Sequence, residues 1–248
     1  MATTEYTRPN YGRCLKVTAA KTGTYGDVNC KTTGGKKAGE YEWYPGFMGP
    51  KPLVKRGFTY NLKPGTGAKF ETTAQTSLTC TGESGKGEIT GAQTTSMSAV
   101  TFTGCSSEGF TCKSPGQAAG TLRTSTAVSE MAWIEEPDKA GSYFGFPNDI
   151  FFTCTGGVFK LEHRITDRGT ISPRKEMKMI LKETLKFTGK KGIPKPEYFD
   201  VFSHWVEGPL HFQVCPPAGF EGCVYASLAA SFVQTYEEKI EVFQTEVR

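Results

Sequence analysis

Cysteine is the residue type in this chain whose number and spacing could do chemistry. The sequence holds eight cysteines among 248 residues. In a turn-rich chain an even number of cysteines predicts disulfides and an oxidising compartment, and metal binding is the competing interpretation. No Cys-x-x-Cys pair occurs, and none of the three histidines is spaced to complete a zinc site. We therefore expect four disulfides, no metal and no cofactor.

Three of the four predicted disulfides close short loops. The spacing along the chain pairs Cys14 with Cys30, Cys105 with Cys112, and Cys215 with Cys223, and elimination then pairs Cys80 with Cys154. The last bond would close by far the longest loop. It should therefore stabilise the fold most, by about 4 kcal/mol in the chain-entropy model.

Other residues that carry catalysis form no recognised motif. Gly-x-Ser-x-Gly, His-Glu-x-x-His and calcium-loop patterns are absent. Ser203 and His204 are adjacent, and neighbours on a strand point to opposite faces. The segment GESGKGE at 82–88 lacks the spacing of a phosphate loop, and we expect a β-turn there. Carboxylates that could serve a glycosidase are present, but their spacing selects no pair; they are Glu130, Glu135, Glu136, Asp138 and Asp149.

Aromatic residues are the candidates for binding a ligand. Tyr41, Trp43 and Tyr44 lie in one short segment, and Trp205 lies in a second aromatic-rich region. Exposed, coplanar rings would form a stacking platform for a sugar or a peptide. The alternative, which the composition favours, is that the rings pack into one end of the fold.

Short polar strands are the elements that must position these groups. Threonine-rich segments with alternating apolar residues recur about every ten residues, a pattern typical of a sandwich or barrel. We expect an all-β fold with little helix: an antiparallel sandwich or partly closed barrel, stapled by disulfides. Residues 1–13 are expected to be a flexible lead-in and residues 14–248 a single β domain. The part after about residue 196 is either a packed C-terminal extension or a lobe of its own.

One segment, residues 175–187, fits both a strand and a helix. Met177, Met179, Leu181, Leu185 and Phe187 share a face at period 2, while a partly different apolar set shares a face at period 3.6. The flanking proline and glycine and the β-rich surroundings favour a strand.

Composition excludes several classes of protein. Hydrophobic residues make up 37% and charged residues 22%, so the chain can form a globular core. The net charge of +4 is too small to predict a nucleic-acid partner. No apolar run is long enough for a transmembrane helix. The first residues, MATTEYTRPNYGRC, lack the apolar region of a signal peptide, so we expect that an export signal preceded the native start.

Several segments resemble one family. VTFTGC followed by CKSPGQAAGTLRT is the most specific match, and it is joined by CLKV, YGDVNC, GEYEWYPG, KFET, LTC, GEITG, FFTC and ISP…MKMILKETLKFTGKKGIPKPE. In this order they are similar to uncharacterised secreted proteins that are abundant in some soil actinobacteria. The resemblance covers roughly residues 12–200. It implies export and a disulfide-containing β domain, and no activity. The Cys215/Cys223 segment and the missing export signal depart from the family.

These observations favour a non-enzymatic role. We expect a secreted or cell-surface protein with a structural or binding function, whose partner is a second copy of itself, by strand addition, or a cell-envelope glycan. An extracellular glycan-binding module that uses Tyr41, Trp43, Tyr44 and Trp205 is the first alternative. A secreted hydrolase is the second.

Overall fold

The computed structural model describes most of the chain, with gaps. Backbone is described for residues 10–19, 22–28, 30, 32, 39–45, 56–72, 76–135, 139–145, 150–156, 159–167, 170–173, 180–188, 195–201, 204–210, 212–215 and 224–243. Side chains are described within residues 10–44, 56–131, 150–156 and 230–237, with the same gaps.

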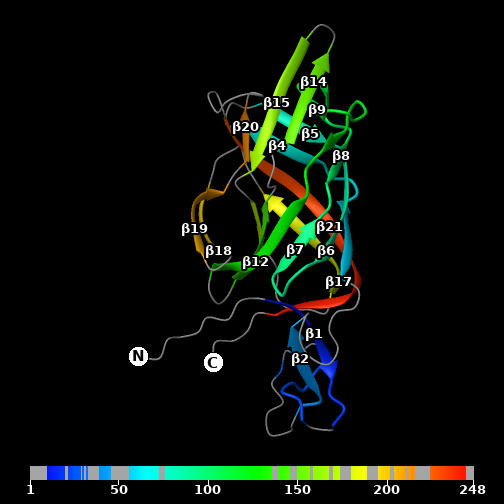
Figure 1. Ribbon diagram of the computed structural model, residues 1–248, viewed down its shortest axis with the longest axis vertical. Coiled ribbons are helices and arrows are strands. Elements are labelled where there is room, and N and C mark those ends of the chain that lie inside the picture. Colours follow the sequence, from blue (N-terminus) through cyan, green and yellow to red (C-terminus); the bar gives the residue numbers. More distant parts are fainter. Residues whose placement is uncertain are drawn as a thin grey trace.

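Strands form all of the regular structure in these ranges (Figure 1). The first eleven are β1 (Asn10–Lys16), β2 (Tyr41–Pro45), β3 (Gly57–Leu62), β4 (Ala68–Thr72), β5 (Ser77–Cys80), β6 (Gly82–Ile89), β7 (Thr94–Met97), β8 (Thr101–Thr103), β9 (Ser106–Ser107), β10 (Phe110–Lys113) and β11 (Leu122–Arg123). The others are β12 (Ala127–Glu135), β13 (Lys139–Gly145), β14 (Ile150–Gly156), β15 (Phe159–Asp167), β16 (Thr170–Pro173), β17 (Ile180–Thr188), β18 (Lys195–Val201), β19 (His204–Leu210), β20 (Phe212–Cys215) and β21 (Val224–Phe243).

Strand β21 is the centre of the topology. It is 20 residues long and pairs with β1, β3, β4, β17 and β20. Antiparallel ladders lead from β21 through β4, β5, β9, β10, β14, β15 and β20 back to β21. A second series runs from β21 through β3, β6, β7, β12 and β13 to β16. No ladder among the described residues joins β16 to β17, so this second series of strands stays open at β16. The predicted all-β, antiparallel, disulfide-stapled fold is confirmed.

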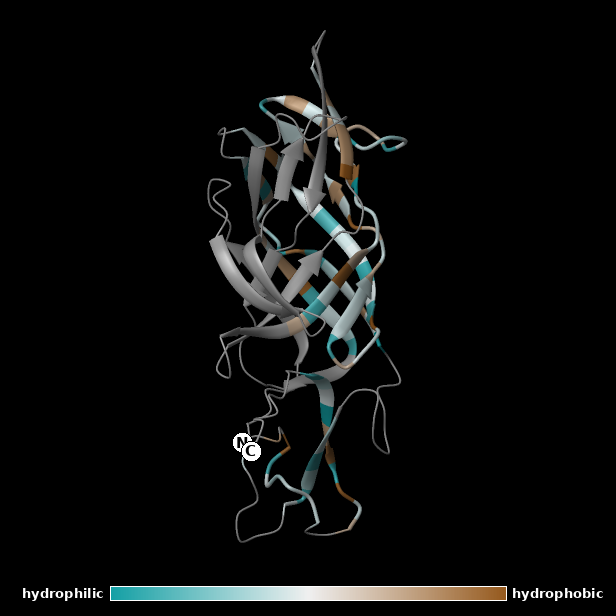
Figure 2. Ribbon diagram, turned by 60° about the vertical axis from the view of Figure 1, so that its left-hand side comes forward, coloured by the Kyte–Doolittle hydropathy of each residue, from teal (hydrophilic) through white to brown (hydrophobic). Residues whose placement is uncertain are grey.

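The core lies on the inner face of this curled sheet. Buried and exposed residues alternate along β3, where Phe58, Tyr60 and Leu62 point inward. Figure 2 shows the same alternation of hydrophobic and hydrophilic residues along the described ribbons. The rings of Phe70 and Phe102 meet edge to face, with centroids 6.0 Å apart. Period-2 patterning therefore places one continuous apolar cluster inside the sheet.

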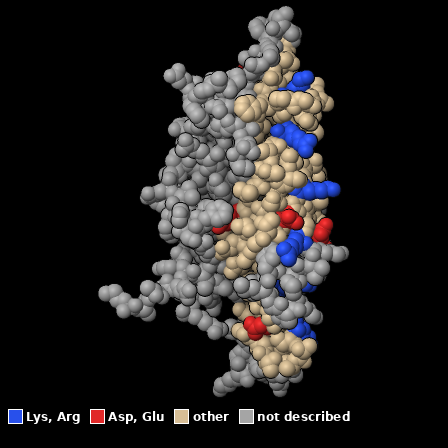
Figure 3. All heavy atoms as spheres, in the orientation of Figure 1, with Lys and Arg blue, Asp and Glu red and all other residues tan. Residues whose placement is uncertain are grey.

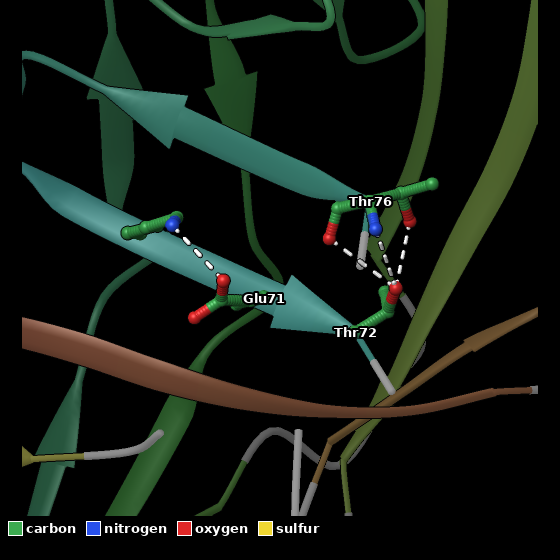
Figure 4. Close-up of polar contacts among 4 residues, drawn as sticks. Glu71, Thr72 and Thr76 are labelled. Atoms are coloured by element: carbon green, nitrogen blue, oxygen red, sulfur yellow. Dashed lines mark hydrogen bonds and ion pairs between the residues drawn. The ribbon is translucent and has the colours of Figure 1, made fainter. Parts of the chain in front are cut away.

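Hydroxyl groups close the connection between β4 and β5. The hydroxyls of Thr72 and Thr76 lie 2.7 Å apart, and the Thr76 N–H donates to the Thr72 hydroxyl (Figure 4). The Thr72 N–H donates in turn to the Thr76 carbonyl. Thr72 is buried, so these bonds satisfy a polar side chain that would otherwise destabilise the end of the strand. Figure 4 also shows the ion pair between Lys69 and Glu71 on β4.

Three disulfides are present among the described residues, and they correct the predicted pairing. Cys14–Cys30 is confirmed. The bonds predicted between Cys105 and Cys112 and between Cys80 and Cys154 are wrong, because Cys80 is bonded to Cys105 and Cys112 to Cys154. The predicted Cys215–Cys223 bond lies outside the described residues.

Strand register explains why the shortest spacing does not decide the pairing. Cys105 and Cys112 do lie opposite each other, but there the Cys112 N–H donates to the Cys105 carbonyl. Paired Cα atoms come closest at positions without ladder hydrogen bonds, and such a position relates Cys112 to Cys154 on β14. The Cα atoms are 3.9 Å apart in that pair and 4.1 Å apart between Cys80 and Cys105.

Two further expectations are corrected near the ends of strands. Residues 82–88 form most of β6 and not a β-turn. Strand β1 begins at Asn10, so residues 10–13 belong to the sheet rather than to a lead-in: Tyr11 is fully buried and pairs with Val242. The ambiguous segment is a strand from Ile180 onward, as expected, and its part before residue 180 lies outside the described residues.

Removing the Cys112–Cys154 bond should cost more stability than removing Cys14–Cys30. We expect Cys112→Ser/Cys154→Ser to lower the free energy of unfolding by about 4 kcal/mol, and Cys14→Ser/Cys30→Ser by about 3 kcal/mol, because the first bond closes the longer loop. Urea unfolding followed by fluorescence measures both values. A larger loss in the Cys14/Cys30 variant would contradict the argument.

Candidate binding groove

An open groove of about 860 Å³ lies against strands β3, β6 and β7 and against Glu237 of β21. Four charged residues line it: Arg56, Lys86, Glu88 and Glu237. Figure 3 shows both signs of charge near mid-height on the described face. Hydroxyl groups and backbone supply the rest of the polar lining. The groove is therefore mixed in character, with two cationic and two anionic side chains beside the apolar Met97 and two glycines.

Two glycines shape the groove from opposite sides of the sheet. Gly57 pairs with Glu88, and a Cβ at Gly57 would lie 2.6 Å from the carboxyl carbon of Glu237. Gly87 pairs with Phe58, and a Cβ there would lie 2.4 Å from the Phe58 ring and 2.7 Å from the Ser96 carbonyl oxygen. A side chain at either position would have to displace these neighbours. The absence of a side chain at Gly57 thus lets Glu237 lie directly over the backbone on the outer face of the sheet. The absence of one at Gly87 lets the Phe58 ring pack closely on the inner face.

Hydrogen bonds to β6 hold one wall of the groove. The N–H and the hydroxyl of Ser98 each donate to the Lys86 carbonyl, at 2.8 Å. Strand β7, which carries Ser96 and Met97, pairs with β6 and with β12. Thr126 lies just before β12 and also lines the groove. Most of this wall is thus a hydrogen-bonded sheet surface, while Ser98 and Thr126 lie in the connections next to β7 and β12.

A buried carboxyl lies on the inner face of the same strand. Glu83 and Tyr60 are each only 6% exposed, and within the described residues neither the carboxyl oxygens of Glu83 nor the Tyr60 hydroxyl has a hydrogen-bond partner. Burial raises the pKa of Glu83 to about 8, so its carboxyl is mostly protonated at neutral pH. Burial, and then the charge of Glu83, raises the pKa of Tyr60. Glu83 is not among the residues that line the groove.

The aromatic candidates do not gather on one sheet. Tyr41, Trp43 and Tyr44 lie on β2, which pairs with β1, whereas Trp205 lies on β19, which among the described strands pairs with β18 alone in a separate two-stranded sheet. Trp43 and Tyr41 pack against the Cys14–Cys30 pair. A Cβ at Gly12 would lie 2.4 Å from the Trp43 ring, so the indole covers this glycine closely.

The Tyr41 and Trp43 rings therefore contribute to the packing of a small unit at the lower end of the molecule in Figure 1. Only the backbone of Trp205 is described.

Of the candidate carboxylates for hydrolysis, the structure describes the side chain of Glu130 alone. Glu130 is buried on β12 opposite Thr94. Glu135 is described only in its backbone, and Glu136, Asp138 and Asp149 lie outside the described residues. No group of three potential metal ligands occurs among the residues that the structure describes. In the same ranges, no helix has the length and apolar character needed to span a membrane.

Comparison with known proteins adds no neighbour. No family model, curated protein or solved structure matches this chain.

Sequence reasoning missed the groove, although one signal was visible. In GESGKGE the glycines at 85 and 87 alternate with Lys86 and Glu88. Because successive residues of a strand point to opposite faces, this pattern indicates a strand segment with charged side chains on one face and only glycines on the other. Local composition pointed to a turn because glycine is common in turns. The Tyr60 and Phe58 rings that cover these glycines come from another strand, which no local pattern reveals.

Stability should fall as pH rises if Glu83 is buried as described. A carboxyl whose pKa is higher in the folded state stabilises the fold fully below its unfolded value, 4.5, and loses that contribution as pH rises to about 8. We expect Glu83→Gln to remove this dependence. Between pH 4 and pH 9 the free energy of unfolding of the wild type should fall by on the order of 5 kcal/mol relative to that of the variant.

Urea unfolding at several pH values measures the difference between the two proteins. Glu88→Gln, on the exposed face of the same strand, is the matched control and should follow the wild type. Parallel pH profiles for the wild type and Glu83→Gln would contradict the assignment.

Proposed function

We propose that the protein is a non-enzymatic, exported protein that binds a cell-envelope glycan through the groove over β3, β6 and β7. The observation that supports this most is the groove itself, a surface that carries both charges on a hydrogen-bonded, disulfide-stapled sheet. Its volume is within the range of about 300–1,000 Å³ that is usual for ligand sites. Paired cysteines are compatible with an oxidising compartment outside the cytosol.

The lining chemistry indicates the class of ligand. Lys86 and Arg56 suit carboxylates, while Glu88 and Glu237 suit amines or hydroxyl donors. The hydroxyls of Ser96 and Thr126 can both donate and accept, whereas that of Ser98, which donates to the Lys86 carbonyl, can still accept. A glycan that carries short peptides offers hydroxyls, amides and both charges, so it matches this lining better than a purely anionic or purely apolar ligand.

Binding is favoured over catalysis by the position of the unusual titrating group. A glycosidase needs one carboxyl with a raised pKa beside the bond that breaks. The described carboxyl with a raised pKa is Glu83, and it lies on the inner face of β6, outside the groove lining. The second expected partner, another copy of the chain added at a strand edge, has weaker support. At β11 the Arg123 N–H already donates to the Ser114 hydroxyl, and at β2 Tyr25 bridges Tyr41.

Co-sedimentation with insoluble glycans tests the proposal. We expect the protein to sediment with purified peptidoglycan and not with cellulose, which carries neither peptide nor charge. Lys86→Glu should weaken binding at least tenfold, because it replaces a cation of the groove with a third carboxylate. Lys113→Glu makes the same change on exposed β10, outside the groove, and should leave binding unchanged.

Two outcomes would contradict the proposal. One is no sedimentation of the wild type with peptidoglycan. The other is equal loss of binding in the Lys86 and Lys113 variants, which would indicate a general charge effect in place of a site.

A further inference from the structure

Four cysteines form a row across four adjacent strands. The row consists of Cys80 at the end of β5, Cys105 just before β9, Cys112 on β10 and Cys154 on β14. Its register follows the ladders: Thr79 pairs with Ser106, Ser106 with Thr111, and Cys112 with Cys154. All four side chains are on the inner face, at most 1% exposed. We call this set the cysteine row.

The two central cysteines belong to different disulfides but face each other. Between them the chain makes a tight hairpin, with Glu108 at φ 49° and Gly109 at φ 84°, the left-handed pair typical of a type I′ turn. The Cys112 N–H donates to the Cys105 carbonyl at 3.0 Å. Side chains directly opposite each other on one face of an antiparallel pair have Cβ atoms about 4.5–5.5 Å apart. Along the row, each central cysteine therefore lies between its own disulfide partner and the other central cysteine.

We propose that the cysteine row is a site of internal thiol–disulfide exchange that is started by an external dithiol. The dithiol reduces Cys80–Cys105, is itself oxidised to a disulfide, and leaves thiols at Cys80 and Cys105. The Cys105 thiolate then attacks the Sγ of Cys112. The bond between Cys105 and Cys112 forms as that between Cys112 and Cys154 breaks, and Cys154 leaves as a thiolate that takes up a proton. This second step is redox-neutral.

The exchange converts one reduction into the loss of two long-range links. The native bonds join residues 25 and 42 positions apart. The product bond only ties the hairpin between β9 and β10, so the covalent links from β5 to β9 and from β10 to β14 are both gone. The product bond closes a shorter loop than either native bond, and the hairpin must rearrange to form it, because its hydrogen-bonded register holds paired Cα atoms farther apart than in the native pairs. The Cys14–Cys30 pair packs in a different cluster and takes no part.

Partial reduction of the wild type tests the proposal. The protein is treated with limiting dithiothreitol at pH 8, quenched with acid, labelled with a maleimide and mapped as peptides. We expect molecules with label on Cys80 and Cys154 and a peptide pair joined through Cys105 and Cys112. Label found only on native partners, Cys80 with Cys105 or Cys112 with Cys154, would overturn the proposal.

Cys80→Ser removes the need for a reductant. This variant leaves Cys105 without its partner, and we expect the purified protein to contain Cys105–Cys112 with label on Cys154. Cys14→Ser is the matched control: it leaves Cys30 unpaired in the other cluster, and the row should keep its native bonds. If Cys80→Ser folds and keeps Cys112–Cys154 with label only on Cys105, the exchange does not occur. If it fails to fold, the wild-type mapping decides.

Discussion

The hydrogen-bond ladders of β21 are the constraint on which the rest of the structure depends. A strand of 20 residues that pairs with five others must bend and twist, and its two ends serve different parts of the sheet. Near Ala226–Ala229 it pairs with β4 and so with the strands that carry the cysteine row. Near Phe232–Tyr236 it pairs with β3, which borders the groove. The staples and the groove are therefore two regions of one sheet.

The pleat separates chemistry into an inner and an outer layer. On β10 the disulfide sulfur of Cys112 is inside, while Thr111 and Lys113 are exposed outside. On β6 the buried Glu83 points inward, and Lys86 and Glu88 point outward into the groove. Because neighbouring residues on a strand face opposite sides, the groove can vary in charge without disturbing the core. This arrangement suits a binding surface on a covalently fixed support.

Buried Glu83 is a cost that the fold carries. Its carboxyl and the Tyr60 hydroxyl have no hydrogen-bond partner among the described residues, and such groups destabilise a core. Protonation lowers that cost at neutral and acidic pH, because the neutral carboxyl is easier to bury than the anion. Three disulfides offset part of it by limiting the freedom of the unfolded chain. Covalent staples thus let the protein tolerate polar groups that an unstapled sheet of this kind would exclude.

The sequence by itself determined the fold class, because period-2 alternation, threonine content and cysteine number are local properties. Cysteine spacing also predicted the Cys14–Cys30 bond, and the surroundings of Ile180–Thr188 favoured a strand where the apolar pattern alone fitted a helix as well. Only the tertiary structure decided how Cys80, Cys105, Cys112 and Cys154 pair, since the choice depends on which strands are neighbours and in which register they pair. The tertiary structure also shows that residues 82–88, where the sequence predicted a turn, form a strand. Glycines there are covered by rings from β3, a contact between residues far apart in the chain.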